Sequence, residues 1–130
     1  MTSSAQVAGP REVLAGFLDL LLRRDPALLD RYAADAVHEF PFDGRRMIGR
    51  DQIKTAFTAG WARNRYRVAG FGEPVVYQTS DSEVIIAEYD VTVAAVASGT
   101  SFTGPIVLVL RARSGEIASI REYFNPAGAA

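Results

Sequence analysis

The spacing of apolar residues changes once along the chain, from a helical period to the alternation of β-strands. In the first half, apolar side chains recur at helical spacing over residues 11–24, 26–33 and 51–63, and a proline or an aspartate stands at the start of each segment. Two brief extended stretches, 37–40 and 46–48, lie between the second and third of these predicted helices. From residue 66 the period is two, over residues 66–78, 83–96, 102–113 and 116–124.

This order of elements predicts an α+β fold. Short turn segments separate the four long strands, so they should pair in succession as an antiparallel sheet. Strands of this length must curl, and the three N-terminal helices can then cover the concave face. We therefore expect a cone-shaped α+β barrel formed by one domain over residues 11–126, with a disordered lead at 1–10 and a short tail at 127–130.

Composition narrows the classes of protein. The net charge is −1 and the arginines are scattered, which argues against nucleic-acid binding. Two small arginine groups are interpreted as solvated surface side chains rather than an anion site: Arg45, Arg46 and Arg50, and Arg63, Arg65 and Arg67. Apolar runs such as 106–110 are far shorter than the roughly 20 residues of a membrane span. The first ten residues have no basic start or apolar stretch, so a cytoplasmic location is expected.

Three segments together resemble a known family. Residues 33–41 (AADAVHEFP), 49–53 (GRDQI) and the pair 114–117 (SGEI) and 121–126 (REYFNP) are similar to motifs of SnoaL-like proteins, in the same order and spacing. These proteins belong to the nuclear-transport-factor-2-like superfamily. The resemblance implies a cone-shaped fold with an enclosed pocket for a small organic molecule and no cofactor. The superfamily includes ketosteroid isomerases, limonene-epoxide-hydrolase-like enzymes, polyketide cyclases and non-catalytic binding modules, so the fold leaves the function open.

The resemblance argues against ketosteroid isomerase chemistry in its usual arrangement. The positions of that enzyme's general base and two oxyanion-hole groups are occupied here by Phe40, Phe17 and Val107. None of these side chains can carry a proton. For the epoxide-hydrolase-like enzymes the match is partial. The two catalytic carboxylates correspond to Asp90 and Glu122, whereas their arginine corresponds to Glu88.

The same comparison puts His38 and Phe40 at the two positions that hold the attacking water in those hydrolases. Strand alternation independently puts Glu88 and Asp90 on one face, and Glu122 and Phe124 on another shared face. If these faces line the cone, three acids and one histidine meet there. Crowded carboxylates in a low-dielectric cavity cannot all ionise, so at least one should stay protonated.

We therefore predict a cofactor-independent acid/base enzyme, a hydrolase, cyclase or isomerase that acts on a small hydrophobic compound such as a polyketide or terpenoid. Asp90 and Glu122 would transfer protons and His38 would position water or a substrate oxygen. Aromatic residues should form pocket walls that favour flat ligands, with Glu88 beside them: Phe17, Phe40, Trp61 and Phe124.

Other interpretations remain open. The acids could lie on the outer face of the sheet and pair with arginines, and His38 could be structural. A metal site built from one histidine and three acids is disfavoured, because no ligand pair has typical metal-site spacing. The runner-up function is a non-catalytic pocket protein. A homodimer is expected, because the broad outer face of the sheet carries apolar residues that a partner could cover: Val91, Val93, Val107, Val109 and Tyr123.

Overall fold

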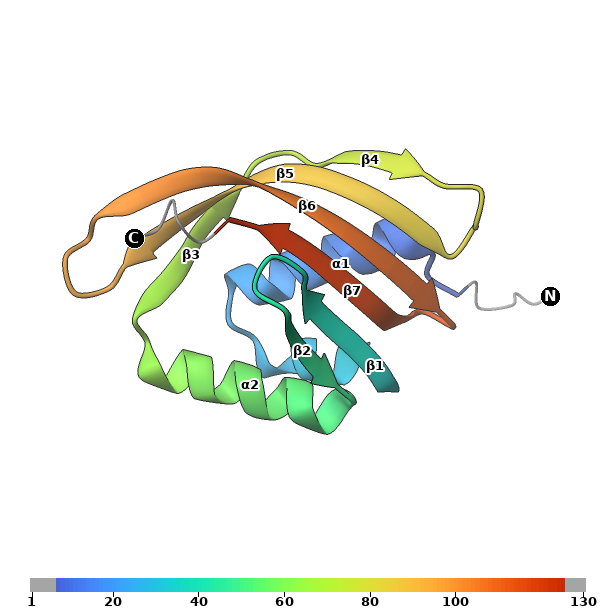
Figure 1. Ribbon diagram of the computed structural model, residues 1–130, viewed down its shortest axis with the longest axis horizontal. Coiled ribbons are helices and arrows are strands. Elements are labelled where there is room, and N and C mark those ends of the chain that lie inside the picture. The colour runs from blue at the N-terminus through green and yellow to red at the C-terminus, as the bar shows by residue number, and fades with distance from the viewer. Residues whose placement is uncertain (1–6, 126–130) are drawn as a thin grey trace.

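The computed structural model describes residues 7–125 as helices followed and interleaved by strands (Figure 1). The elements in chain order are α1 (Pro10–Leu22), the 3-10 helix η1 (Pro26–Arg31), β1 (Tyr32–Phe40), β2 (Arg45–Ile48), α2 (Arg50–Arg63), β3 (Tyr66–Phe71), β4 (Val75–Gln78), β5 (Val84–Ala95), β6 (Ser101–Arg113) and β7 (Glu116–Phe124). The predicted α+β class is confirmed. Residues 1–6 and 126–130, which include most of the predicted lead and the whole tail, lie outside the described residues.

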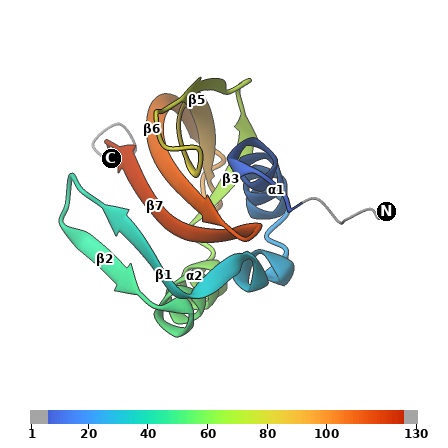
Figure 2. The ribbon, with the colours of Figure 1, turned by 90° about the vertical axis from the view of Figure 1, so that its right-hand side faces the viewer.

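The strands form one strongly curved sheet in the order β2-β1-β7-β6-β5-β3, and β4 pairs with β5 beyond the end of β3 (Figure 2). All neighbours are antiparallel except β1 and β7, which run parallel. The expected purely antiparallel sheet is therefore corrected to a mixed one. The strand order does not return on itself, so the cone is an open curved sheet rather than a closed barrel.

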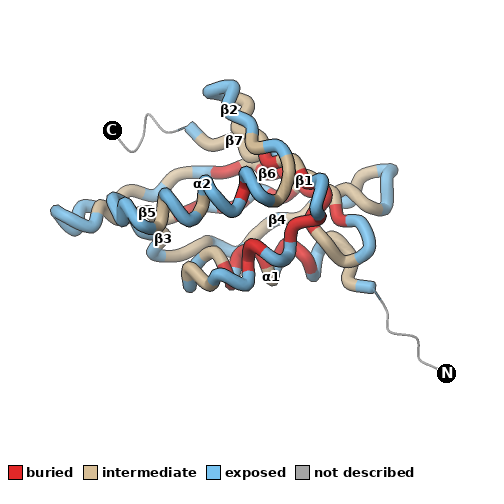
Figure 3. Tube along the Cα trace, turned by 90° about the horizontal axis from the view of Figure 1, so that it is seen from below, coloured by how far each residue is buried: buried red, intermediate tan, exposed pale blue. Residues whose placement is uncertain are grey.

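The two α-helices cover different parts of the concave face. Helix α1 packs on β3, β5 and β6, whereas α2 packs on β1 and β2. The buried part of the chain follows the inner sides of the long strands and one side of α1, while α2 remains largely exposed (Figure 3). Fully buried residues such as Phe17, Leu108 and Ile120 form the core that joins α1 to the sheet.

Four elements differ from the sequence-based expectation. The predicted second helix is a single short 3-10 helix, and the chain is already extended at Tyr32, so β1 is longer than expected. The expected strand 66–78 divides into β3 and β4. Between them, the Gly72 amide donates to the Asp90 carbonyl over 2.8 Å, and Pro74 has no N–H group with which to continue the ladder. Helix α1 begins at Pro10, one residue early, inside the predicted lead.

The junction between β2 and α2 depends on Gly49. Its φ of 88° lies in the left-handed region that favours glycine. In this conformation the Gly49 amide donates to the Ala36 carbonyl over 2.7 Å. This bond ties the start of α2 to β1, so that the inner face of β1 and the buried side of α2 meet.

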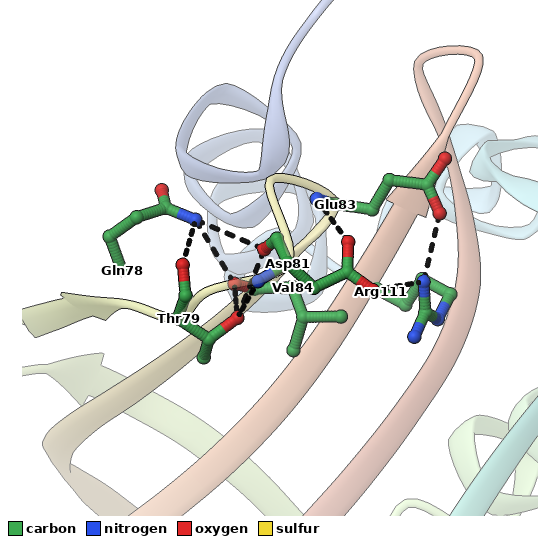
Figure 4. A network of polar contacts seen from close by, with 6 residues as sticks. All are labelled: Gln78, Thr79, Asp81, Glu83, Val84 and Arg111. Carbon is green, nitrogen blue, oxygen red and sulfur yellow. Dashed lines mark hydrogen bonds and ion pairs between the residues drawn. The ribbon is translucent and has the colours of Figure 1, made fainter.

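The turn between β4 and β5 is fixed by a polar network (Figure 4). The Thr79 hydroxyl donates to the Val84 carbonyl over 2.9 Å, and the Gln78 amide donates to the same oxygen over 3.3 Å. Arg111 of β6 donates to Asp81 and Glu83 over 3.0 and 2.8 Å. The network aligns β5 with β6, but its members are largely exposed, so it defines register more than it adds stability.

The outer face of the sheet carries half-buried Val107, Val109 and Tyr123, as the sequence predicted. Val91 and Val93 do not belong to this face: Val91 is buried, and both alternate with exposed or outward residues of β5 on the inner side. The homodimer expected from this face stays a prediction. Across residues 7–125, no helix combines the length and the apolar character that a membrane crossing requires.

The curvature depends on the inner core, so the matched pair Ile120→Ala and Ile48→Ala should separate the two faces. Ile120 is fully buried, and its truncation should lower the free energy of unfolding by about 2–5 kcal/mol. Ile48 on β2 is 55% exposed, and the same change should cost less than about 1 kcal/mol. Urea unfolding monitored by circular dichroism measures both values. Equal losses would contradict the placement of β7 in the core.

Candidate active site

A chain of three polar side chains runs through the inner face near β1 and β7. The Tyr32 hydroxyl lies 3.1 Å from Nδ1 of His38, and Nε2 of His38 lies 3.1 Å from Oε1 of Glu122. Tyr32 and His38 are 0% and 1% exposed, whereas the Glu122 side chain keeps 19% of its surface accessible. The chain therefore begins in the core and ends on a carboxylate that a small molecule can approach.

The pairing of β1 with β7 brings these residues together. In the parallel ladder His38 lies opposite Ile120, so Glu122 is two residues farther along the neighbouring strand and on the same face. Tyr32 enters the same face across an irregularity between residues 32 and 37. The histidine ring is enclosed by aromatic rings: Phe40 stacks on it at a centroid distance of 4.9 Å, and Phe57 meets it edge-on at 6.2 Å.

The direction of the hydrogen bonds follows from the chemistry of the two ends. Burial, and then the charge of Glu122, raise the pKa of Tyr32 well above its ordinary value, so the phenol is neutral and can donate. A carboxylate only accepts. The consistent arrangement is Tyr32 O–H donating to Nδ1 of His38 and Nε2–H of His38 donating to Glu122. Every polar atom of the buried imidazole is then satisfied.

A second tyrosine lies close enough to feel the Glu122 charge. Tyr89 projects from the inner face of β5 and is 6% exposed, with Phe71 packed edge-on at 5.6 Å. Burial first, and the negative charge of Glu122 second, raise the pKa of Tyr89 far above its ordinary value. Within residues 7–125 its hydroxyl forms no hydrogen bond. A buried donor without a partner is uncommon and points to a bound water or ligand as its complement.

A cleft of about 190 Å³ lies between α2 and the β1–β2 hairpin. Its walls are mainly apolar and aromatic and include two arginines, and its lining residues are Phe40, Arg45, Met47, Ala56, Phe57, Gly60, Trp61 and Arg63. Phe57 and Trp61 contact each other at a centroid distance of 5.7 Å. Because Phe40 and Phe57 also contact the His38 ring, the cleft is adjacent to the polar chain.

The structure does not gather the four polar residues as the sequence suggested. Glu88 and Asp90 are exposed on the outer face of β5, because Ala87, Tyr89 and Val91 occupy its inner face. Asp90 therefore cannot form a proton-transferring pair with Glu122, and the expected crowding of carboxylates is corrected. Glu88 instead lies beside Tyr77 of β4, where it raises the pKa of that phenol. The structure does bring His38 and Glu122 into contact.

The aromatic residues divide between the site and the core. Phe40 and Trp61 line the cleft. Phe17 is 1% exposed within the core beneath α1, so it is not part of the cleft wall. Phe124 lies two residues beyond Glu122 on the same strand, with its ring 6.1 Å from that of Phe102. Of the four aromatic residues expected to line the pocket, only Phe40 and Trp61 belong to the lining of this cleft.

Sequence reasoning missed Tyr32, Phe57 and Tyr89. Tyr32 was counted on a helix, although its even spacing to His38 and Phe40 fits an early start of the strand. Tyr89 stands in the apolar set of β5, where simple polarity alternation would have put it inside and the acids outside. As potential metal ligands, His38 and Glu122 stand together, and no third histidine or acid joins them among the residues that the structure describes.

Comparison with known proteins identifies the family. The model of the SnoaL-like domain matches residues 14–120, and the chain belongs to this family, as the sequence motifs predicted. Among curated proteins, an uncharacterized Bacillus subtilis protein, YesE, is 26% identical over 119 residues, which cover 88% of this chain and 80% of the relative.

Solved structures share the fold. A proposed isomerase from Bacillus subtilis has a TM-score of 0.81 at 25% identity, over 90% of this chain and 86% of that one. A proposed polyketide cyclase from Pseudomonas putida KT2440 has a TM-score of 0.79 at 23% identity, over 94% of this chain and 96% of that one. The curved sheet with two helices on its inner side is thus the fold of the family.

The two buried tyrosines should respond differently to loss of their hydroxyls. At pH 7, Tyr32→Phe leaves Nδ1 of His38 without its donor and should cost about 1–3 kcal/mol of unfolding free energy. Tyr89→Phe loses no hydrogen bond within residues 7–125 and should change stability by less than about 0.5 kcal/mol. Urea unfolding of the two variants measures the difference.

The same pair predicts the alkaline response of the fold. A raised pKa in the folded state means that the unfolded chain releases its phenolic protons first, so the stability present below about pH 10 falls as pH rises further. Each tyrosine contributes a slope of about 1.4 kcal/mol per pH unit. Tyr89→Phe should therefore reduce the loss between pH 10 and 11. A loss as steep as that of the unmodified protein would contradict the buried neutral state of Tyr89.

Proposed function

We propose that this protein is an acid/base enzyme that relocates a proton on a small, largely apolar organic compound, in an isomerisation or a ring closure. The observation that carries the proposal is the chain from buried Tyr32 through buried His38 to the accessible carboxylate of Glu122. A carboxylate that only paired with the histidine would not need a second buried hydrogen-bond partner behind the ring. A catalytic base that must keep one orientation does need this support.

In the proposed reaction Glu122 removes a proton from a carbon next to a carbonyl group. The C–H electron pair forms the new C=C bond of an enolate, and the former carbonyl electrons move to oxygen. In an isomerisation, Glu122 returns the proton at another carbon and the C=O bond re-forms. In a cyclisation, the enolate carbon attacks a second carbonyl carbon, and Glu122 gives its proton to the new alkoxide. Both routes balance without a cofactor.

His38 and Tyr32 act as positioning residues in this scheme. The Nε2–H group of His38 donates to Oε1 of Glu122, which orients the carboxylate and leaves its other oxygen for the substrate. Tyr32 holds the imidazole in the tautomer that makes this donation possible. The two hydrogen bonds, from Tyr32 to His38 and from His38 to Glu122, therefore fix the orientation of the carboxylate.

Tyr89 is suited to donate a hydrogen bond to the carbonyl oxygen of the substrate. Its phenol is neutral and buried, and its hydroxyl has no partner among residues 7–125. A substrate oxygen that receives this hydrogen bond would be stabilised as it becomes negative. In this proposal, base and donor act on one carbonyl group from different strands.

The family supports this reaction class. The assignments of the two structural neighbours, an isomerase and a polyketide cyclase, both describe rearrangements that acid/base groups promote. The aromatic cleft beside His38 offers contact area to a flat apolar compound, for which a polyketide or a terpenoid is suitable.

Replacement of Glu122 by glutamine should remove the base and preserve its shape. We expect at least a hundredfold loss of rate, the usual scale for a general base. Proton abstraction can be measured without knowledge of the final product, by NMR of deuterium incorporation into cyclic ketones and enones in D2O. Trp61 fluorescence first selects the compounds that bind. Their affinity should change little in Glu122→Gln.

Asp90→Asn is the matched control, because this carboxylate lies on the outer face. It should exchange at the rate of the unmodified protein. If compounds that bind near Trp61 exchange no faster with the protein than in buffer, the acid/base proposal fails and a non-catalytic binding protein becomes the better description. An equal loss in Asp90→Asn would contradict the role given to Glu122.

The role of His38 can be separated from mere structure by two matched variants. The side-chain amide of glutamine can supply an N–H near the position of Nε2–H, whereas leucine has no donor. His38→Leu should therefore lower kcat at least tenfold with little change in KM, and His38→Gln should restore part of that rate. Equal kcat values for the two variants, both shown to be folded by circular dichroism, would assign His38 a purely structural role.

A further inference from the structure

Two arginines from different elements line the cleft beside Trp61. Arg45 starts β2 and Arg63 ends α2, and the lining of the cleft includes no aspartate or glutamate. The guanidinium of Arg45 lies 4.2 Å from the centre of the Phe40 ring, which is a cation–π contact. The cleft therefore combines apolar and aromatic walls with two positive side chains, Arg45 and Arg63, which we call its rim.

These arginines are only weakly committed within the chain. Arg45 has one ion pair, to Asp43 at 3.4 Å, and both side chains of this pair are strongly exposed, so solvent screens it. Arg63 forms no ion pair with any residue between 7 and 125, although it stands in the last turn of α2, where the helix dipole favours a positive charge. Both guanidinium groups can take up a ligand without breaking a buried interaction.

We infer that the cleft binds an amphipathic carboxylate, a flat apolar or aromatic body with one carboxylate group, through Arg45 and Arg63. Guanidinium groups match a carboxylate in geometry and charge, and the aromatic walls take the apolar body. The volume of about 190 Å³ equals roughly six water molecules and suits one ring with a short side chain. This inference deepens the proposed function by naming its substrate class.

The charge pattern also fixes the direction of such a ligand. Glu122 is hydrogen-bonded to His38, against which Phe40 and Phe57 pack, and it repels a second negative charge, whereas the rim attracts it. The carboxylate should therefore stay at the rim, with the apolar body against Phe40, Phe57 and Trp61. Any reactive carbonyl of the substrate would lie at the end remote from its carboxylate.

A pair of neutral and charged probes tests this inference directly. Trp61 is the only tryptophan of the chain and forms part of the cleft wall, so its fluorescence reports binding there. The probes are 3-phenylpropionate and 3-phenylpropanamide, which share shape and differ in charge. At low salt the carboxylate should bind about tenfold more tightly than the amide. Raising NaCl from 50 to 500 mM should remove most of this preference, because salt screens exposed charges.

The preference should disappear when both arginines are replaced by glutamine, Arg45→Gln with Arg63→Gln. Arg65→Gln is the control: Arg65 is exposed, lies two residues from Arg63 and does not line the cleft. It should keep the tenfold preference. Circular dichroism shows whether each variant is folded, and the two single variants, each expected to lose part of the preference, replace the double variant should it unfold.

Three results would overturn the inference: equal affinities of the two probes, an equal effect of Arg65→Gln, or no binding of either probe at millimolar concentration. Repeating the titrations in Glu122→Gln separates this inference from the proposed reaction. If the carboxylate preference persists but no deuterium exchange is found, the binding inference stands and the acid/base proposal fails. If exchange depends on Glu122 but the preference is absent, only the binding inference fails.

Discussion

The parallel pairing of β1 with β7 is the constraint on which the site depends. These strands are separated by about 80 residues of chain, and their ladder sets His38 opposite Ile120. A shift of one residue in this register would turn every side chain of β1 to the other face. His38 would then leave Glu122, and the stacking of Phe40 on the imidazole would be lost with it. The hairpin to β2 and the bond from Gly49 to Ala36 hold β1 in this register.

The order of helices and strands followed from periodicity, because each periodic segment reports its own burial. The parallel pairing of β1 with β7 could not be predicted in this way, since the two strands are far apart in the sequence and neither contains a signal for its partner. The 3-10 helix was taken for an α-helix for a related reason: Leu28 and Leu29 are buried in either case, and a segment of six residues is too short for the period to decide.

The candidate site was half predictable. Alternation correctly grouped Glu122 with Phe124, and it also grouped Glu88 with Asp90. From the acids alone, strand alternation cannot show which of the two faces of β5 is the inner one. The flanking Ile85, Ala87 and Val91 decide it, because they are buried and leave the acids outside. The family correspondence predicted that the acids occupy the inner face of β5, whereas hydrophobic burial predicts that their apolar neighbours do. The structure follows the burial of the apolar residues.

An aromatic layer, formed by Phe40 and Phe57, keeps the arginines of the rim from contacting the Glu122 carboxylate. If a guanidinium of the rim reached Glu122, the two would form an ion pair, and the carboxylate would have to break it before it could take a proton from a substrate. Phe40 and Phe57 occupy that space on one side and enclose His38 on the other. Glu122 is therefore left with His38 as its hydrogen-bond partner, which orients the carboxylate. The same layer allows the rim to attract an anion while the base remains free to act.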